Sequence, residues 1–352
     1  MPTVAHTQTA APGQRAIAEL LTAADIEING DRPWDMQVHD ERLFRRLLSG
    51  STLALGETYM DAWWDCEALD EFSFRVHRAG LREKVARSWR FYLNAVKAYL
   101  LNPQGPSRAY SIGEQRYDIG NDLYQAMLDD RMVYSCAYWA DAQTLNDAQV
   151  AKLDLVCRKI DLAPGDCVLD IGCGWGSFAQ YAAQAYGAKV VGITVSEEQA
   201  QLARRRGRDL PIEIRYQDYR QLDELFDHVV SIGMYEHVGP KNYATYMDVV
   251  RRCLRPGGLF LLHTIGTSIS SHTVDPWIDR YIFPGGVIPS AAQIANAAEG
   301  RFVMEDWHNI GPHYDPTLVA WHQNVEAAWK ALGDCYDERF RRMWAYYLLM
   351  SA

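Results

Sequence analysis

The stretch VLDIGCGWG, residues 168–176, decides the fold. It predicts the end of a buried strand, Cys167–Ile171, then a turn with three glycines at alternate positions and a helix over 177–185. Glycine lets the backbone approach a ligand closely, and the first turn of a helix offers unpaired N–H groups. The stretch therefore indicates a ligand site where a strand ends and a helix begins.

The ligand of this turn is indicated by its residue types. Gly172, Gly174 and Gly176 follow Asp170 as Gly-x-Gly-x-Gly, which differs from the Gly-x-Gly-x-x-Gly of dinucleotide-binding folds. An acid before the turn suits a cationic or hydroxyl-bearing ligand, and S-adenosylmethionine carries an ammonium, a sulfonium and a ribose. The alternative is a tight strand-to-helix turn that binds nothing.

Outward from this turn, short apolar runs alternate with helical segments. This alternation is typical of a parallel sheet covered on both faces, so we expect a doubly wound α/β domain. Strands are expected at Cys167–Ile171, Lys189–Thr194, 212–215, 228–232 and 259–263, and a further helix at Glu197–Arg206.

The N-terminal part has a different pattern. Residues 1–101 are mostly helical and hold no glycine-rich ligand loop, so we expect a small helical domain there, a linker at 102–108 and the catalytic domain at 109–352. Segment 81–102 combines an apolar face with Arg82, Arg87 and Arg90. It is either a domain-packing helix with a charged outer side or a surface that meets anionic lipid headgroups.

The composition excludes several classes of protein. No window reaches the roughly 18 consecutive apolar residues of a membrane span, and no signal peptide is visible, so we expect a cytoplasmic protein. A net charge of -10 argues against nucleic-acid binding. The seven cysteines are scattered without a Cys-x-x-Cys pair, so we expect reduced thiols and no metal.

Several stretches together resemble the cyclopropane-fatty-acid synthases, a family that includes the mycolic-acid cyclopropane synthases. They are RYDIGNDLY, MVYSCAYW, VLDIGCGWG, GITVSEEQ, SIGMYEHVGPKNY, FLLHTIG, DPWIDRYIFPGG and HYDPTLVAW, within residues 116–321. The resemblance implies a Rossmann-like class I methyltransferase domain that uses S-adenosylmethionine. RPWDMQVHDERLF and LGETYMDAWWD look like the extra N-terminal domain of the bacterial phospholipid-modifying branch.

The same resemblance implies which residues bind the cofactor. Besides Asp170 and the three glycines, they are Tyr134, Ser135, Thr194, Gln199, Gln217 and Asp218. Tyr134 could place its ring near the sulfonium in a cation–π contact, or it could be a core residue. Thr194 stands where many methyltransferases of this fold have an acid, so we expect the ribose contact from Gln199.

The family's chemistry is methyl transfer to a cis double bond, after which a bound bicarbonate removes a proton as the cyclopropane ring closes. The residues implied around the bicarbonate are Cys136, Glu236, His263, Ile265 and Tyr314. The residues alone leave alternatives open: His263 could be a core histidine, Glu236 a helix-capping acid, and Cys136 a packing thiol rather than a nucleophile.

The resemblance also implies partners. We expect unsaturated phospholipids as the substrate, peripheral association with the inner face of the cell membrane, and a homodimer through the N-terminal domain. Three alternatives are a lipid methyltransferase that leaves a methyl branch or a methylene group, a non-catalytic lipid-binding protein, and a nucleic-acid methyltransferase, which the charge disfavours. Family members usually continue beyond the position of YYLLMSA, so closure of an acyl tunnel here is an open expectation.

Overall fold

The computed structural model describes residues 12–48, 52–81 and 120–352. They form two compact units. Unit 1 combines the N-terminal elements, through residue 81, with Asp275–Tyr281 and Gly333–Ala352. Unit 2 contains the described residues from Gly120 to Val274 and Ile282–Leu332.

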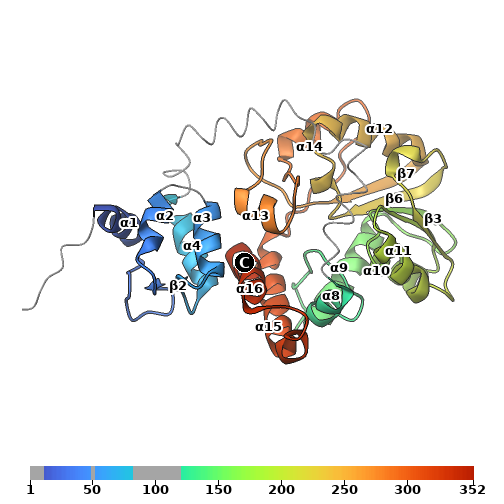
Figure 1. Ribbon diagram of the computed structural model, residues 1–352. Coiled ribbons are helices and arrows are strands. Elements are labelled where there is room, and N and C mark those ends of the chain that lie inside the picture. Colours follow the sequence, from blue (N-terminus) through green and yellow to red (C-terminus); the bar gives the residue numbers. More distant parts are fainter. Residues whose placement is uncertain (1–11, 49–51, 82–119) are drawn as a thin grey trace, which may run out of the picture. The chain divides into compact units, whose positions relative to one another are not determined.

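Unit 2 is built on a parallel sheet with the strand order β5-β4-β3-β6-β7 (Figure 1). Its strands are β3 (Cys167–Ile171), β4 (Lys189–Thr194), β5 (Ile212–Tyr216), β6 (Phe226–Ile232) and β7 (Leu254–His263). The first strand, β3, lies in the middle, and the chain extends the sheet first to one side and then to the other. This order confirms the expected doubly wound α/β fold.

Helices cover both faces of this sheet because its strands alternate their apolar side chains between two cores. Leu169 and Ile171 pack into one core with α12 and α14, whereas Val168 packs into the other with α9 and α10. In Figure 1, α12 and α14 lie above the strands and α9, α10 and α11 below them. These helices are α9 (Leu145–Lys159), α10 (Ser177–Tyr186), α11 (Glu197–Arg206), α12 (Tyr243–Cys253) and α14 (Ala291–Ala298).

The expected strands are confirmed, and β7 differs in length. It begins at Leu254 rather than at residue 259 and runs through Pro256. Its pairing with β6 shifts register between Phe226 and His228, and Gly257 has a φ of 82°. A proline and a left-handed glycine are tolerated here because β7 is at the edge of the sheet and is irregular at this point.

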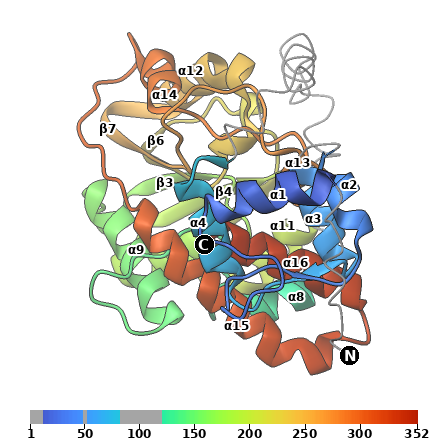
Figure 2. The ribbon, with the colours of Figure 1, turned by 90° about the vertical axis from the view of Figure 1, so that its left-hand side faces the viewer.

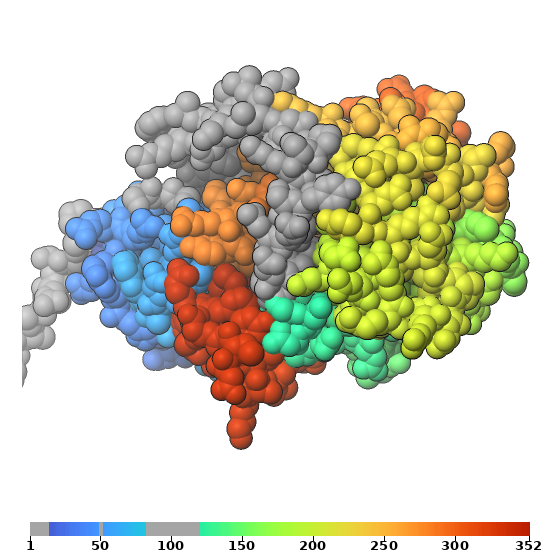
Figure 3. Space-filling model, turned by 45° about the vertical axis from the view of Figure 1, so that its right-hand side comes forward, coloured from blue at the N-terminus to red at the C-terminus, as the bar shows by residue number. Residues whose placement is uncertain are grey.

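Unit 1 is mainly helical. Its helices are α1 (Pro12–Thr22), α2 (Arg42–Leu48), α3 (Thr52–Met60), α4 (Leu69–Arg78), α13 (Pro276–Tyr281) and α16 (Glu338–Ser351), with a small antiparallel pair, β1 (Gln37–Val38) and β2 (Trp64–Asp65). Helix α16 packs beside α3 and α4 (Figure 2). Helix α13 packs on α3, and in Figure 3 the orange surface that includes α13 adjoins the blue surface of the N-terminal helices.

This grouping differs from the expected division of the chain at two places. Residues 275–281 and 333–352, expected in the catalytic domain, belong to unit 1. The ring of Trp277 packs so closely on Gly56 that a Cβ there would lie 2.4 Å from it. Arg342 donates to the backbone oxygens of Tyr59 and Trp64 at 2.6 and 2.9 Å. The expected linker at 102–108 and most of segment 81–102 lie outside the described residues.

Unit 2 also contains α8 (Asn121–Met127) and α15 (Tyr314–Leu332), which pack on each other. Within the described parts of the chain, no helix combines the length and apolar character needed to cross a membrane.

Candidate active site

The carboxyl ends of β3 and β6 mark the place where the sheet reverses its strand order. In doubly wound sheets the helices that follow neighbouring strands leave on opposite faces at this point, which opens a crevice for ligands. The residues expected around the cofactor follow β3, β4 and β5, and Glu236 and His263 follow or end β6 and β7. All of them belong to unit 2.

The glycine turn after β3 has the geometry that its sequence predicts. Gly172, Gly174 and Gly176 have φ values of 81°, 54° and 77°, a region that L side chains rarely adopt. A Cβ on Gly172 would lie 2.7 Å from the side chain of Met234, whereas one on Gly174 would meet nothing within 4 Å. Gly172 is therefore required by close packing, and Gly174 leaves open space beside the turn.

Asp170 is a buried acid one residue before the end of β3. The residue is 2% exposed, and its Oδ2 atom accepts no hydrogen bond from any described residue. Burial raises the pKa of this carboxyl, and the Lys152 ammonium partly opposes the rise. A buried carboxylate oxygen without a donor indicates that a ligand group completes its hydrogen bonding.

The end of β4 carries the expected ribose residues. Thr194 Oγ1 donates to Gln199 Oε1 at 3.1 Å, and both side chains are buried. No hydrogen bond of the Gln199 amide nitrogen is formed within the described part of the chain, so that nitrogen is available to a ligand hydroxyl.

Gln217 and Asp218 lie at the next strand end. The backbone N–H of Gln217 donates to Thr194 O at 3.0 Å, which places β5 beside the cofactor residues of β4. Asp218 is buried and accepts from the backbone and the guanidinium of Arg220 at 2.9 and 2.7 Å. Asp218 therefore also holds the turn that follows β5.

Tyr134, Ser135 and Cys136 approach the same edge of the sheet from a segment outside it. Ser135 lies 4.0 Å from the position that a Cβ on Gly233 would take, just after β6. Cys136 is 2% exposed, and burial raises the pKa of its thiol to about 12. A thiol that stays protonated is a poor nucleophile, which favours the packing interpretation.

A band of aromatic rings connects the glycine turn to Tyr314. Trp175 lies 4.9 Å from Tyr124, Tyr124 lies 5.3 Å from Tyr134, and Tyr134 lies 5.2 Å from Trp321, all between ring centroids. Trp321 and Tyr314 follow at 6.4 Å in an edge-to-face arrangement. Rings of this kind attract a neighbouring cation and leave no strong nucleophile beside it.

Glu236 lies in a short 3-10 helix, Tyr235–His237, that follows β6. Its Oε1 accepts the backbone N–H of Ile265 at 2.7 Å, and its buried Oε2 has no hydrogen-bond partner among the residues that the structure describes. Burial raises the pKa of this carboxyl, while the Ile265 N–H lowers it. Ile265 thus orients Glu236 through its backbone N–H.

His263 is the last residue of β7, and its backbone oxygen accepts the Gly233 N–H at 2.9 Å. Desolvation, with a smaller contribution from Lys152, lowers the pKa of its imidazole to about 3. A neutral imidazole can donate from one nitrogen and accept at the other. His263 can therefore serve as a hydrogen-bond donor without adding a charge.

Two residues that sequence reasoning missed are Gln149 and Lys152 on α9. Both are buried, and both contact Ser135. The signal was present, because Leu145, Ala148, Leu153 and Val156 form the apolar face of this helix and the two polar residues lie within it. A polar residue on a buried face must find a partner, which singles out both positions.

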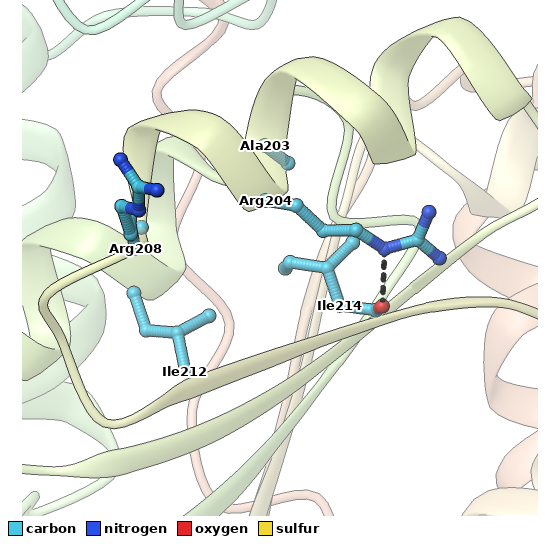
Figure 4. Close-up of a pocket in the computed structure, with 6 residues that line it drawn as sticks. Ala203, Arg204, Arg208, Ile212 and Ile214 are labelled. Carbon is cyan, nitrogen blue, oxygen red and sulfur yellow. Dashed lines mark hydrogen bonds between the residues drawn. The ribbon is translucent and has the colours of Figure 1, made fainter.

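One surface cavity of about 210 Å³ lies between α11 and β5 (Figure 4). It is lined by Ala203, Arg204, Gly207, Arg208, Ile212 and Ile214. Arg204 Nε donates to Ile214 O at 3.0 Å across it. None of the expected site residues lines this cavity, so it is separate from the site described above.

Comparison with known proteins identifies the family of the chain. The family model described as mycolic acid cyclopropane synthetase matches residues 104–352. The cyclopropane-fatty-acyl-phospholipid synthase of Escherichia coli K12 is 52% identical over 334 residues, which cover 95% of this chain and 87% of that protein. The chain belongs to the cyclopropane-fatty-acyl-phospholipid synthase family.

Two further proteins show how far the similarity to this chain extends. A probable fatty acid methyltransferase of Pseudomonas putida is 40% identical over 66% of this chain and 62% of its own length. The crystal structure of the mycolic acid cyclopropane synthase CmaA1, complexed with SAH and CTAB, is 30% identical with a TM-score of 0.62. That match covers 69% of this chain and 93% of CmaA1.

Proposed function

We propose that this enzyme transfers a methylene group from S-adenosylmethionine to the cis double bond of unsaturated phospholipid acyl chains, which closes a cyclopropane ring. The observation that carries the proposal is one crevice with two unsatisfied buried carboxylates. Asp170 lies beside the glycine turn and Glu236 lies after the neighbouring strand β6. The similarity to the Escherichia coli synthase over 95% of the chain supports the choice of reaction.

The residues around β3 and β4 fit the cofactor. Asp170 offers a buried acceptor, the open space beside Gly174 admits a ligand against the backbone, and the Gln199 amide suits a ribose hydroxyl. When bound, S-adenosylmethionine supplies an electrophilic methyl carbon on a sulfonium. The chain's contribution is to hold that carbon beside the aromatic band, where positive charge that develops on the acyl chain is stabilised without water.

We assign proton removal to a bicarbonate ion held by Glu236 and His263, after β6 and at the end of β7, together with Cys136 and Tyr314. The Cys136 backbone N–H forms no hydrogen bond within the described residues, and we assign it, neutral His263 and Tyr314 as donors to the anion. Glu236 Oε2 would accept the bicarbonate O–H, because Oε1 is already occupied by the Ile265 N–H. Accepting that hydrogen is how Glu236 can lie beside an anion without repelling it.

The experiment for the reaction is incubation with S-adenosylmethionine and vesicles of unsaturated phospholipid, followed by mass spectrometry of the acyl chains. Products heavier by one CH₂ group are expected, and unchanged chains would reject the proposal. For the base, wild-type enzyme depleted of bicarbonate should slow and recover when bicarbonate is added back. If depletion of bicarbonate leaves the rate unchanged, proton removal would instead be assigned to a side chain.

A second candidate is a lipid methyltransferase that leaves a methyl branch or a methylene group. The similarity to the probable fatty acid methyltransferase of Pseudomonas putida favours testing it. The cofactor half of the site would serve either reaction, and only the product separates them. The ring is distinguished from a methylene group by its resistance to mild hydrogenation.

We also propose that the enzyme associates with the cytoplasmic face of the membrane and forms a homodimer through its N-terminal domain, residues 1–101. Binding to anionic lipid is assigned to the sequence around Arg82, Arg87 and Arg90, since basic residues act locally despite a net charge of -10. Replacing the three arginines by Gln should weaken vesicle binding and its salt dependence. Unchanged binding would leave the segment with a structural role, and sedimentation measures the oligomeric state.

A further inference from the structure

Lys152 is a charged residue in the interior of unit 2. It lies on α9, its side chain is 1% exposed, and its Nζ donates to Ser135 Oγ at 2.8 Å. One turn earlier, Gln149 Nε2 donates to Ser135 O at 2.9 Å and to Val133 O at 3.3 Å. Helix α9 therefore holds the 129–137 segment through the Ser135 hydroxyl and through the backbone oxygens of Val133 and Ser135.

The 129–137 segment is held from two further sides. Asp129, 5% exposed, accepts the backbone N–H of Arg131 at 3.2 Å and of Val133 at 2.7 Å. Ser177, the first residue of α10, donates to Arg131 O at 2.6 Å, which ties the segment to the helix after the glycine turn. Lys152 is thus part of a connection between α9, this segment and the glycine turn.

The charges that face Lys152 are those of the cofactor region. A buried ammonium is tolerated only when anions or strong acceptors surround it. Burial lowers the pKa of Lys152, and Asp129, then Cys136, then Asp170 oppose that shift. The same ammonium lowers the pKa of Asp170 and of His263. These groups share one electrostatic environment, which centres on Lys152.

The hydrogen bond to Lys152 also fixes what Ser135 can do. Because Ser135 Oγ accepts from the ammonium, its hydroxyl hydrogen points elsewhere, and it finds no acceptor within the described residues. Asp170 Oδ2 likewise lacks a donor. A donor from Ser135 and an acceptor from Asp170 are the groups that an amino-acid-like end of a ligand, with its ammonium and carboxylate, would satisfy.

We propose that Lys152 is a positioning residue for the cofactor, which directs the Ser135 hydroxyl toward the ligand and favours the ionised form of Asp170 that would receive a cationic group. This inference rests on the proposed function, because it takes S-adenosylmethionine as the ligand. Lys152 contacts neither reacting atom; it acts through Ser135 and Asp170.

The test is calorimetric binding of S-adenosylhomocysteine to the full chain, from about pH 6 to about pH 8.5. Lys152→Met keeps the length of the stem and removes the charge, so we expect roughly tenfold weaker binding at the low end of this range. Without the cation, the pKa values of Asp129 and Asp170 rise further, so binding should recover as the pH increases. The matched control is Lys159→Met on the same helix, where the lysine pairs with Asp306 at the surface.

The outcomes separate the possibilities. Equal binding by wild type and Lys152→Met, or a loss that is the same at every pH, would overturn the inference, because a packing defect has no reason to titrate. Lys152→Arg should restore part of the low-pH affinity. If Lys152→Met does not fold, Lys152→Gln carries the same test, with an expected low-pH loss of roughly fivefold; unchanged affinity in this variant would overturn the inference. Failure of the wild type to bind would instead reject the proposed cofactor.

Discussion

The two sides of the crevice are built in different ways. On the side of β3 and β4, the backbone makes the site: three left-handed glycines, a strand end and a helix start lie within one continuous stretch. On the side of β6 and β7, side chains make it, and Glu236, Ile265 and Tyr314 come from separate segments. The difference suggests a division of labour in which the first side grips the cofactor and the second moves a proton.

The largest effect expected from this division is on turnover without an effect on binding. Glu236→Gln keeps the shape and the contact with the Ile265 N–H but removes the carboxylate that orients the anion. The rate of product formation should fall by roughly 10²–10⁴-fold. The dissociation constant of S-adenosylhomocysteine should stay within about threefold of wild type, since Glu236 follows β6 and is not part of the glycine turn after β3.

The division of roles between the two sides would be contradicted if Glu236→Gln weakened cofactor binding as much as it slowed turnover. Added bicarbonate should also stimulate depleted wild type more than depleted Glu236→Gln. Equal stimulation would mean that the carboxylate does not contact the anion.

Gly172→Ala should have a smaller effect, and on cofactor binding rather than on turnover. The left-handed backbone costs ~1–2 kcal/mol for an L residue, and the new Cβ would press on Met234 at 2.7 Å. Cofactor binding should weaken by roughly 10–100-fold. The control is Gly165→Ala, where φ is 93° and a Cβ meets nothing within 4 Å. It should lose stability through the backbone strain alone and keep its affinity for the cofactor; equal losses of affinity in the two variants would show a global effect.

The pH dependence of stability tests His263. Burial depresses its pKa to about 3, so the unfolded chain, with an ordinary pKa of about 6.5, binds the proton more readily. The stabilisation is therefore complete above about pH 6.5 and is lost as the pH falls toward 3. His263→Gln should flatten urea-unfolding stability across that window. Replacing the exposed His308 by Gln should not, and an unchanged slope in His263→Gln would place the imidazole in water.

The smallest effect is expected at Cys136. Its buried thiol contacts the backbone oxygens of Ala137 and Ile310, and a serine hydroxyl can donate to one of them. Methyl transfer from a sulfonium to an alkene needs no covalent enzyme intermediate. Cys136→Ser should retain activity within roughly tenfold in the vesicle assay. Complete loss in a folded variant that binds cofactor would assign the thiol a chemical role.

The cofactor side could be predicted from the sequence because its residues are contiguous. A strand, three glycines and a helix fix one another locally, and β3, β4 and α11 have the predicted bounds. Glu236 and His263 could be placed at strand ends from the pattern, but only the family resemblance brought them together with Tyr314. Contacts between distant segments are not encoded in local periodicity.

Lys152 and α16 show what the local pattern hides. Lys152 interrupts an apolar helical face, yet nothing nearby in the sequence names Ser135 as its partner. Helix α16 follows the catalytic elements in sequence but packs on α3 and α4, with Ser73 donating to Met350 O at 2.9 Å. Such docking depends on shape complementarity between elements far apart in the chain, which sequence order does not report.

The central claim is that one side of the crevice delivers a methyl carbon and the other removes one of its hydrogens. The most direct measurement uses S-adenosylmethionine with a fully deuterated methyl group and unsaturated phospholipid vesicles, with mass spectrometry and hydrogenation of the acyl chains. The account predicts a hydrogenation-resistant product whose new carbon keeps two of its three deuterium atoms. A new carbon that keeps all three would mean that the enzyme makes a methyl branch, which would contradict the assigned proton removal.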